Sequence, residues 1–452
     1  MYKRQIQPLL RRKLARRAVA EPGYAVAVEE RFGHYTVPPD QGRVWIHAVS
    51  LGETRAAAIL LARLREQMPA LRLLLTNGTA TGRAEGEKLL RPGDVMVWQP
   101  WDTPGAVARF LDHFQPGIGI LMETEVWPNL IAGCASRGVP VALANARLNE
   151  RSLRQALRLS WLARPTYAAL TAVWAQTEGD AERLRALGAN VAGVFGNLKF
   201  DATPDPEQVE AGRRWRRAAG WPVILLASSR EGEEEAFLEL ISALPSVKWP
   251  QDAIKSEVVS DAIGDKATPQ VQWLIVPRHP QRFDAVAQII EAHGWKVSRR
   301  SSWGGQPPPE TGALEGGRAV WLGDSMGEMA RYYALADVAL LGGSFEPLGG
   351  QNLIEAAACG CPVVMGPHTF NFAQAADDAL AAGAAQRVVD IDEGVRGAAE
   401  LAGDPARERV SRQALDFAAR HRGAAERMAE AIVALLPPLP PSPAPIGGSA
   451  PG

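Results

Sequence analysis

Apolar runs of strand length alternate with helix-length segments along most of the chain, and this alternation limits the possible folds more than any other feature. Residues 44–49 read as a buried strand, and Leu60, Leu61, Leu64 and Met68 mark the apolar face of the helix that follows. Repeated βαβ alternation predicts a parallel sheet that is covered by helices on both faces.

The alternation runs through two halves of the chain. Further strands are expected at 71–76, 117–122, 139–144 and 173–176 in the first half, and at 223–227, 273–276, 320–322, 338–341 and 362–365 in the second. Helices are expected near 233–244, 281–294, 351–359 and 373–382. We therefore predict an α/β protein with two doubly wound, Rossmann-like domains that face a central cleft.

The length of 452 residues fits two or three domains. We predict a basic N-terminal segment at 1–20, one domain at 21–200, a second at 201–436 and a disordered tail rich in Pro, Ser and Gly at 437–452. Residues 246–270 and 303–317 interrupt the pattern and are expected to be surface loops.

Charge and cysteine content exclude several classes of protein. Lys and Arg (49) balance Asp and Glu (50), which gives no support for a nucleic-acid partner. Three cysteines are too few for a disulfide framework or a four-cysteine zinc site, and the seven histidines do not fall at metal-ligand spacings. We expect no metal and no cofactor. No apolar run reaches the length of about 18 residues that a membrane-spanning helix needs.

The first 17 residues contain cations and no acid: Lys3, Arg4, Arg11, Arg12, Lys13, Arg16 and Arg17. Apolar residues near helical spacing interleave with them. This pattern is typical of an interfacial helix that is attracted to an anionic membrane surface, and it is equally typical of a solvated, frayed terminus.

Polar residues that follow the predicted strands of the first half are the candidates for chemistry, because ligands bind beyond the carboxyl ends of parallel strands. Glu53 falls in the first turn of a helix, where it either complements the helix dipole or acts as a general base. Glu123 and Glu125 follow another strand; one of them could cap the next helix. Lys199 is either a surface residue or the cation that offsets their repulsion.

In the second half, the acidic run 233–235 opens a helix and is explained by the helix dipole. Arg278 and His279, between two prolines, suit a phosphate or a base edge. The glycine-rich stretch 342–350 leads through Asn352, Leu353 and Ile354 to Glu355. Glycines let a ligand approach the backbone, and amides at a helix N-terminus favour a phosphate, so this stretch predicts a nucleotide site.

These segments together resemble one family, the 3-deoxy-D-manno-octulosonic acid (Kdo) transferases of lipopolysaccharide synthesis, which form glycosyltransferase family 30. The matching segments are 47–53, 122–129, 145–148, 196–201, 276–280, 324–329, 342–355 and 366–372, within a resemblance that covers about residues 22 to 430. The resemblance implies a GT-B glycosyltransferase, with an N-terminal domain that binds the acceptor lipid IVA and a C-terminal domain that binds the donor CMP-Kdo.

The resemblance also implies roles for individual residues. Glu53 matches the catalytic base, which deprotonates a sugar hydroxyl of the lipid A precursor; this hydroxyl attacks the anomeric carbon of Kdo with inversion as CMP leaves. Glu123 and Lys199 match positions that stabilise the transition state. The positions that match CMP contacts are Pro277, Arg278, Met326, Gly327, Glu328, Asn352, Leu353, Ile354 and Glu355. The family context places the protein peripherally on the cytoplasmic face of the inner membrane.

The chain departs from the family pattern in a few places. It has the short basic segment where relatives begin with an apolar anchor, Arg230 where a histidine is common and Ala356 where a proline is common. Two other functions stay open from the sequence: a non-catalytic protein that binds nucleotide or anionic lipid on a GT-B scaffold, and a GT-B sugar-nucleotide epimerase.

Overall fold

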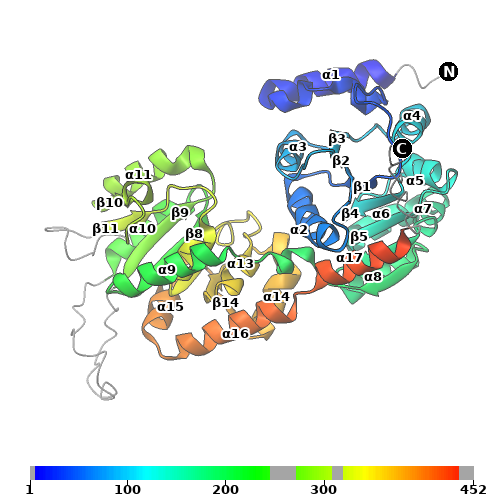
Figure 1. The fold of residues 1–452 in the computed structure, drawn as a ribbon. Coiled ribbons are helices and arrows are strands. Elements are labelled where there is room, and N and C mark those ends of the chain that lie inside the picture. Colours follow the sequence, from blue (N-terminus) through cyan, green and yellow to red (C-terminus); the bar gives the residue numbers. More distant parts are fainter. Residues whose placement is uncertain (1–5, 245–270, 308–318, 437–452) are drawn as a thin grey trace, which may run out of the picture. The chain divides into compact units, whose positions relative to one another are not determined.

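The computed structural model describes residues 6–244, 271–307 and 319–436 (Figure 1). The chain forms two compact units. The first contains Met1–Asp201 and Arg422–Gly452, and the second contains Ala202–His421. Both are parallel α/β sheets with helices on their faces, as predicted. Within the described ranges, none of the helices combines the length and the apolar character that crossing a bilayer requires.

The first unit is built on a seven-stranded parallel sheet with the order β3-β2-β1-β4-β5-β6-β7. Its strands are β1 Val44–His47, β2 Leu73–Asn77, β3 Val95–Trp98, β4 Ile118–Met122, β5 Val141–Ala146, β6 Ala172–Ala175 and β7 Val191–Val194. The strand order reverses direction between β1 and β4, which makes the carboxyl ends of these two strands the expected place for a ligand.

Helices cover both faces of this sheet. The helices of this unit are α1 Ile6–Ala20, α2 Leu51–Gln67, α3 Ala80–Glu87, α4 Pro104–Phe114, α5 Pro128–Ala135, α6 Glu150–Arg158, α7 Ser160–Ala168, α8 Glu178–Ala186 and α17 Ala424–Leu435. Leu60, Leu61 and Leu64 of α2 are buried against one face, as their helical spacing predicts. The other face is covered by residues of α4, α5 and α8.

Helix α17 corrects the predicted domain boundary, because residues 422–436 were assigned to the second domain. In the structure α17 packs beside α2, and Met428 and Ile432 belong to the core of the first unit (Figure 1). The Asp201 carboxylate accepts hydrogen bonds from the backbone of Gly423 and Ala425, so it caps this helix.

Residues 6–20 of the basic N-terminal segment form helix α1, whereas residues 1–5 lie outside the described residues. Leu14, which belongs to this helix, is buried. The Arg11 guanidinium lies 4.3 Å from the centre of the Phe32 ring and donates a hydrogen bond of 2.9 Å to Glu29. Leu9 and Val19 are exposed.

The second unit repeats the architecture with the strand order β10-β11-β9-β8-β12-β13-β14. Its strands are β8 Val223–Ser229, β9 Gln272–Pro277, β10 Lys296–Arg299, β11 Ala319–Leu322, β12 Val338–Leu341, β13 Val363–Met365 and β14 Ala385–Arg387. Its helices are α9 Pro206–Ala218, α10 Glu233–Ala243, α11 Phe283–Ala292, α12 Met329–Leu335, α13 Leu353–Ala358, α14 Ala373–Ala381, α15 Ile391–Gly403 and α16 Ala406–Arg420.

Two contacts fix the layers of this unit. Helix α9 approaches α12 so closely that a Cβ atom on Gly212 would lie 2.3 Å from the carbonyl oxygen of Arg331. The Asp337 carboxylate, which is 2% exposed, accepts hydrogen bonds from Val223 N (2.7 Å) and from the Arg216 guanidinium. It thereby joins α9, β8 and the start of β12.

All ten strands expected from the sequence are present, and the structure adds β3, β7, β10 and β14. Residue 303 was expected in a surface loop, but Trp303 is buried and packs edge-on against Trp215 and Trp321. The predicted loop 246–270, most of the loop 303–317 and the predicted tail 437–452 lie outside the described residues.

Candidate active site

Glu53 lies at the start of α2, directly beyond the carboxyl end of β1. Its carboxylate accepts hydrogen bonds from Val49 N (2.8 Å) and from the Ser50 hydroxyl (2.9 Å), while Ser50 caps the helix by accepting from Glu53 N. This arrangement is close to a capping box. The structural and catalytic interpretations of Glu53 are therefore compatible, since the cap orients the carboxylate that would act as base.

The surroundings of Glu53 favour its protonated form. Burial raises its pKa from 4.5 to about 7, against the hydrogen bonds from Val49 and Ser50, and the negative charges of Glu125 and Glu123 add to the rise. Burial also raises the pKa of Glu125, against the hydrogen bond from Trp127, and the negative charge of Glu123 adds to the rise. A carboxyl group with a pKa near neutrality is well suited to accept a proton during catalysis.

Glu123 follows β4 in the left-handed conformation, with φ of 55°, and is 4% exposed. The Arg147 guanidinium donates to its carboxylate at 2.7 Å. Arg147 follows β5, the strand next to β4, so the sheet brings together two side chains that are distant in sequence. The sequence analysis left Lys199 open, either as a surface residue or as the cation for these carboxylates; the structure adds Arg147 as a cation that pairs with Glu123.

Lys199 lies in the short helix Leu198–Asp201, which is fixed to the end of β5. Asn145 accepts a hydrogen bond from Leu198 N at 3.0 Å. Asn145 is fully buried, has φ of 53°, and its Nδ2 has no acceptor among the residues that the structure describes. Through Asn145 and Arg147, the end of β5 positions the turn of Lys199 and holds Glu123.

Neither Glu123 nor Glu125 caps α5, contrary to one interpretation of the sequence. The Asp102 carboxylate accepts from Asn129 N (3.1 Å) and from Leu130 N (2.8 Å) at the start of that helix. The Glu125 carboxylate instead accepts from the Trp127 indole at 2.9 Å. Both glutamates are therefore left for other roles.

In the second unit, Glu233 and Glu234 do more than complement the helix dipole. Glu233 is 1% exposed and accepts from Gly343 N (2.7 Å) and Arg230 N (2.9 Å), which joins the loops after β12 and β8. Glu234 is fully buried and binds Arg282 at 2.6 Å. Each acid fixes a loop at the carboxyl edge of this sheet, a role that the sequence analysis missed.

Three arginines surround His279 just beyond β9. Burial lowers the pKa of His279, and the positive charges of Arg230, Arg278 and Arg282 lower it further, while the negative charge of Glu231 opposes them. Arg278 is exposed and its backbone N–H donates to Ser229 O, whereas Pro277 is buried at the end of the strand. This concentration of positive charge suits a phosphate group.

Met326, Gly327 and Glu328 form a turn that follows β11. Met326 is 66% exposed and Gly327 has φ of 77°. The Glu328 carboxylate is bound by Arg300 at 3.0 Å, and also by Arg331 and Ser325. Glu328 is thus held by its own unit.

The stretch from Asn352 to Glu355 opens α13. The Asn352 side chain accepts from Ile354 N at 3.2 Å, and the side chains of Leu353 and Ile354 are buried in the core. Any ligand contact of Leu353 and Ile354 would therefore use their backbone. The amide of Gly343 is not available for a phosphate, because it already donates to Glu233.

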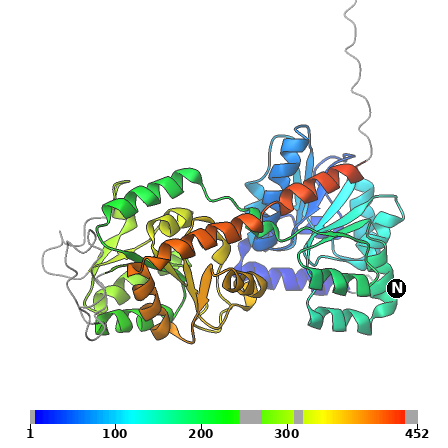
Figure 2. The same ribbon diagram turned by 90° about the horizontal axis from the view of Figure 1, so that it is seen from below.

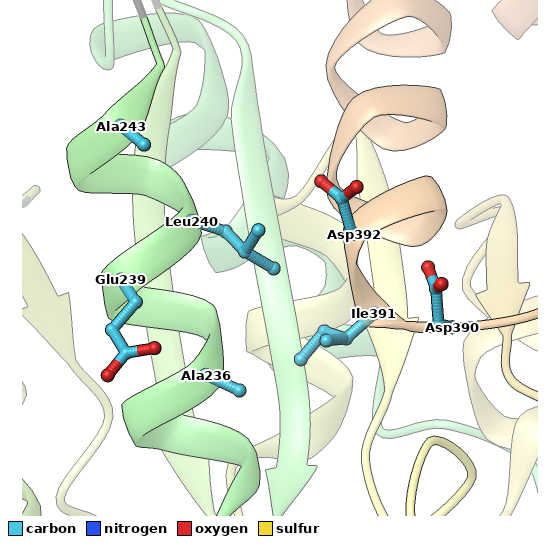
Figure 3. A pocket seen from close by; sticks show the side chains of 7 residues that line it. All are labelled: Ala236, Glu239, Leu240, Ala243, Asp390, Ile391 and Asp392. Carbon is cyan, nitrogen blue, oxygen red and sulfur yellow. The ribbon is translucent and has the colours of Figure 1, made fainter.

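A pocket between α10 and α15 contains none of the predicted site residues (Figure 3). Leu240 and Ile391 form its apolar part, and Glu239, Asp390 and Asp392 contribute carboxylates. This acidic pocket does not suit a phosphate ligand. Among the residues with described positions, no three or more His, Cys, Asp or Glu side chains group as metal ligands would.

Comparisons with known proteins indicate one family. A family model described as 3-deoxy-D-manno-octulosonic-acid transferase (kdotransferase) matches residues 27–202. The 3-deoxy-D-manno-octulosonic acid transferase of Bordetella pertussis is 45% identical over 95% of this chain and 96% of its own length. The transferase of the same name from Haemophilus influenzae is 30% identical over 94% of this chain and 95% of its own length.

The fold has counterparts among solved structures. A glycosyltransferase from Rickettsia africae superimposes with a TM-score of 0.52 and 12% sequence identity, over 87% of this chain and 98% of that one. At this level of identity the likeness concerns the fold, and it agrees with the predicted GT-B class.

Proposed function

Because the chain belongs to the Kdo transferase family, and is therefore a glycosyltransferase, we propose that it transfers Kdo from CMP-Kdo to the lipid A precursor lipid IVA. The transfer inverts the anomeric centre and releases CMP. It belongs to lipopolysaccharide synthesis.

The observation that carries this proposal is the environment of Glu53. The carboxylate is oriented by Val49 N and the Ser50 hydroxyl at the switch point of the first sheet, and its pKa is raised to about 7. A protein that only binds nucleotide or lipid has no need of such a base. In the proposed step, Glu53 removes a proton from a sugar hydroxyl as the oxygen attacks the anomeric carbon of Kdo, and the electron pair of the broken bond leaves with CMP.

Other residues of the first unit would stabilise charge in this step. The transition state carries positive charge on the Kdo ring, which the Glu123 carboxylate would stabilise while Arg147 keeps that carboxylate oriented. Lys199 would offset the negative charge that develops on the leaving phosphate.

The donor would bind to the loops at the carboxyl edge of the second sheet. Arg278, with Arg230 close to His279, would bind the CMP phosphate. The backbone of Leu353 and Ile354 and the side chain of Glu355 would hold the nucleoside, and Met326 would supply an apolar contact. Because the released CMP carries no diphosphate, cationic side chains and amide hydrogen bonds can stabilise its phosphate.

We place the reaction at the cytoplasmic face of the inner membrane, where the protein is peripheral. Helix α1 supports this location, since Arg12, Lys13 and Arg16 are exposed on it together with Leu9 and Val19. Cationic side chains beside exposed apolar ones attract a helix to an anionic lipid surface.

The test is CMP release from CMP-Kdo in the presence of a tetraacylated lipid A precursor, with the product analysed by mass spectrometry. The product mass should increase by one or more Kdo units. Glu53→Ala should abolish transfer and keep CMP binding, whereas Glu66→Ala, at an exposed position of the same helix, should keep both. An active Glu53→Ala variant, or a wild-type chain that binds CMP without glycosylating the lipid, would overturn the proposal.

A further inference from the structure

The junction between α6 and α7 exposes apolar side chains that the fold does not use. Helix α6 contains no fully buried residue, and Leu159 is the single residue between the end of α6 and the start of α7. Leu157 is 38% exposed, Leu159 53% and Trp161 74%. We call this surface, with its flanking arginines, the α6–α7 elbow.

The two helices are attached to the first unit through other residues. Leu153 and Ala156 of α6 and Ala163 and Tyr167 of α7 pack on the hydrophobic core. The exposed residues of the elbow are therefore not needed to hold the helices in place. A tryptophan that is mostly exposed leaves a large apolar surface in water, and such surfaces mark interaction sites.

Positive charge surrounds these apolar side chains. Arg151, Arg154, Arg158 and Arg164 are exposed, and Glu150 is the single acid between residues 150 and 168. Glu150 lies 3.7 Å from Arg154, which leaves the charges of the other three arginines in excess. Arg151, Arg154 and Arg158 are three and four residues apart, so they lie on one face of α6.

We propose that the α6–α7 elbow docks on an anionic lipid bilayer. Trp161, Leu157 and Leu159 would enter the headgroup region, and the arginines would contact lipid phosphates. An indole ring suits this boundary because it is apolar with one polar N–H group. The excess of positive charge favours an anionic lipid surface over a neutral protein face. The inference rests on the proposed function in so far as that function needs a membrane-borne acceptor.

The position of the elbow fits a joint contact with α1. Figure 2 shows the two teal helices α6 and α7 toward the same lower side of the first unit as the blue helix α1. Both surfaces present exposed arginines and exposed apolar side chains. The elbow thus provides a second membrane contact within the same unit.

Vesicle binding by the full chain tests the elbow directly. The protein is mixed with vesicles of equal parts phosphatidylglycerol and phosphatidylcholine, or of phosphatidylcholine alone, and sedimented. Binding should require the anionic lipid. Trp161→Ser should weaken vesicle binding roughly tenfold or more, because it removes the indole ring that would enter the headgroup region. The double variant Arg154→Ser with Arg158→Ser should also weaken it roughly tenfold or more, since each surface arginine contributes about fivefold.

The matched control is a double variant on α16 of the second unit, Arg409→Ser with Arg412→Ser, beside the exposed Leu415. It removes the same number of exposed arginines and should bind vesicles like the wild type. Unfolding curves equal to the wild type show that the elbow variants fold. Unchanged vesicle binding by both elbow variants would overturn the proposal, as would a lipid-free dimer that these variants dissociate.

Activity separates this proposal from the proposed function. With acceptor dispersed in detergent, the elbow variants should release CMP at the wild-type rate, because the elbow contains no residue of the candidate active site. A wild-type chain that binds anionic vesicles through the elbow but transfers no Kdo would refute the proposed function alone. Transfer together with vesicle binding that the elbow variants leave unchanged would refute the elbow alone.

Discussion

Replacing Glu53 by glutamine should stabilise the folded protein above neutral pH while it removes the proposed base. Burial raises the pKa of Glu53 from 4.5 to about 7. The unfolded chain therefore releases this proton near pH 4.5, whereas the folded chain keeps it until about pH 7. Because the unfolded state binds fewer protons in this window, stability falls as the pH rises through it.

The pKa difference sets the size of the effect. It corresponds to a loss of about 3 kcal/mol of unfolding free energy. This loss is absent below about pH 4.5 and complete above about pH 7. Glutamine has no charge to desolvate, and its amide can still accept from Val49 N and donate to the Ser50 hydroxyl. Relative to Glu53→Gln, the wild-type chain should lose about 2 to 3 kcal/mol between about pH 5 and about pH 8.

Urea unfolding of both proteins, followed by tryptophan fluorescence at these two pH values, measures this difference. Glu66→Gln on the same helix is the control, because Glu66 is 59% exposed beside Arg63 and its replacement should leave the pH dependence unchanged. A stability difference between wild type and Glu53→Gln that is equal at both pH values would refute the reasoning from burial.

Three further variants test contacts of the second unit. Glu233→Gln should weaken CMP binding at least tenfold in calorimetry, because the glutamine amide cannot accept the loop N–H groups as the carboxylate does; unchanged affinity would contradict this positioning role. Asp337→Asn should lower the unfolding free energy by about 3 kcal/mol, since it leaves the Arg216 guanidinium without its buried anion. Gly212→Ala should cost about 1 to 3 kcal/mol, because the added methyl group meets the Arg331 carbonyl; an unchanged urea midpoint would disprove such close packing.

The strands that the sequence analysis missed differ from the others in their place in the sheets. β3, β7, β10 and β14, which the sequence analysis missed, are the edge strands of the two sheets. Edge strands are covered on fewer sides, and accordingly most of their residues are partly or fully exposed. A continuous apolar run is the signal of a strand buried on both faces, and β10 and β14 have no such run, so periodicity could not identify them. Strand β3 does have an apolar run, Val95–Trp98, and the sequence analysis missed it in spite of that signal.

The candidate site could be predicted as a set of strand ends but not as a set of contacts. The positions of Glu53 and Glu123 after apolar strands were visible in the sequence. Their partners were not, because the sheet order decides which loops meet: Arg147 reaches Glu123 from the neighbouring strand, and Glu233 binds Gly343, 110 residues away. A run of acids at a helix start gives no sign of such a partner.

The return of α17 to the first unit bears on how the protein is made. Residues 202–421 leave the ribosome before α17 does, which at about 5 to 20 residues per second takes tens of seconds. During that time the first unit lacks Met428 and Ile432, and the apolar side of α2 that they cover stays open to other chains. The second unit can finish folding on the ribosome, while the unit that begins the chain is the last to be completed. A chaperone that protects nascent chains would therefore find its target at the start of this protein, not at the end that has just emerged.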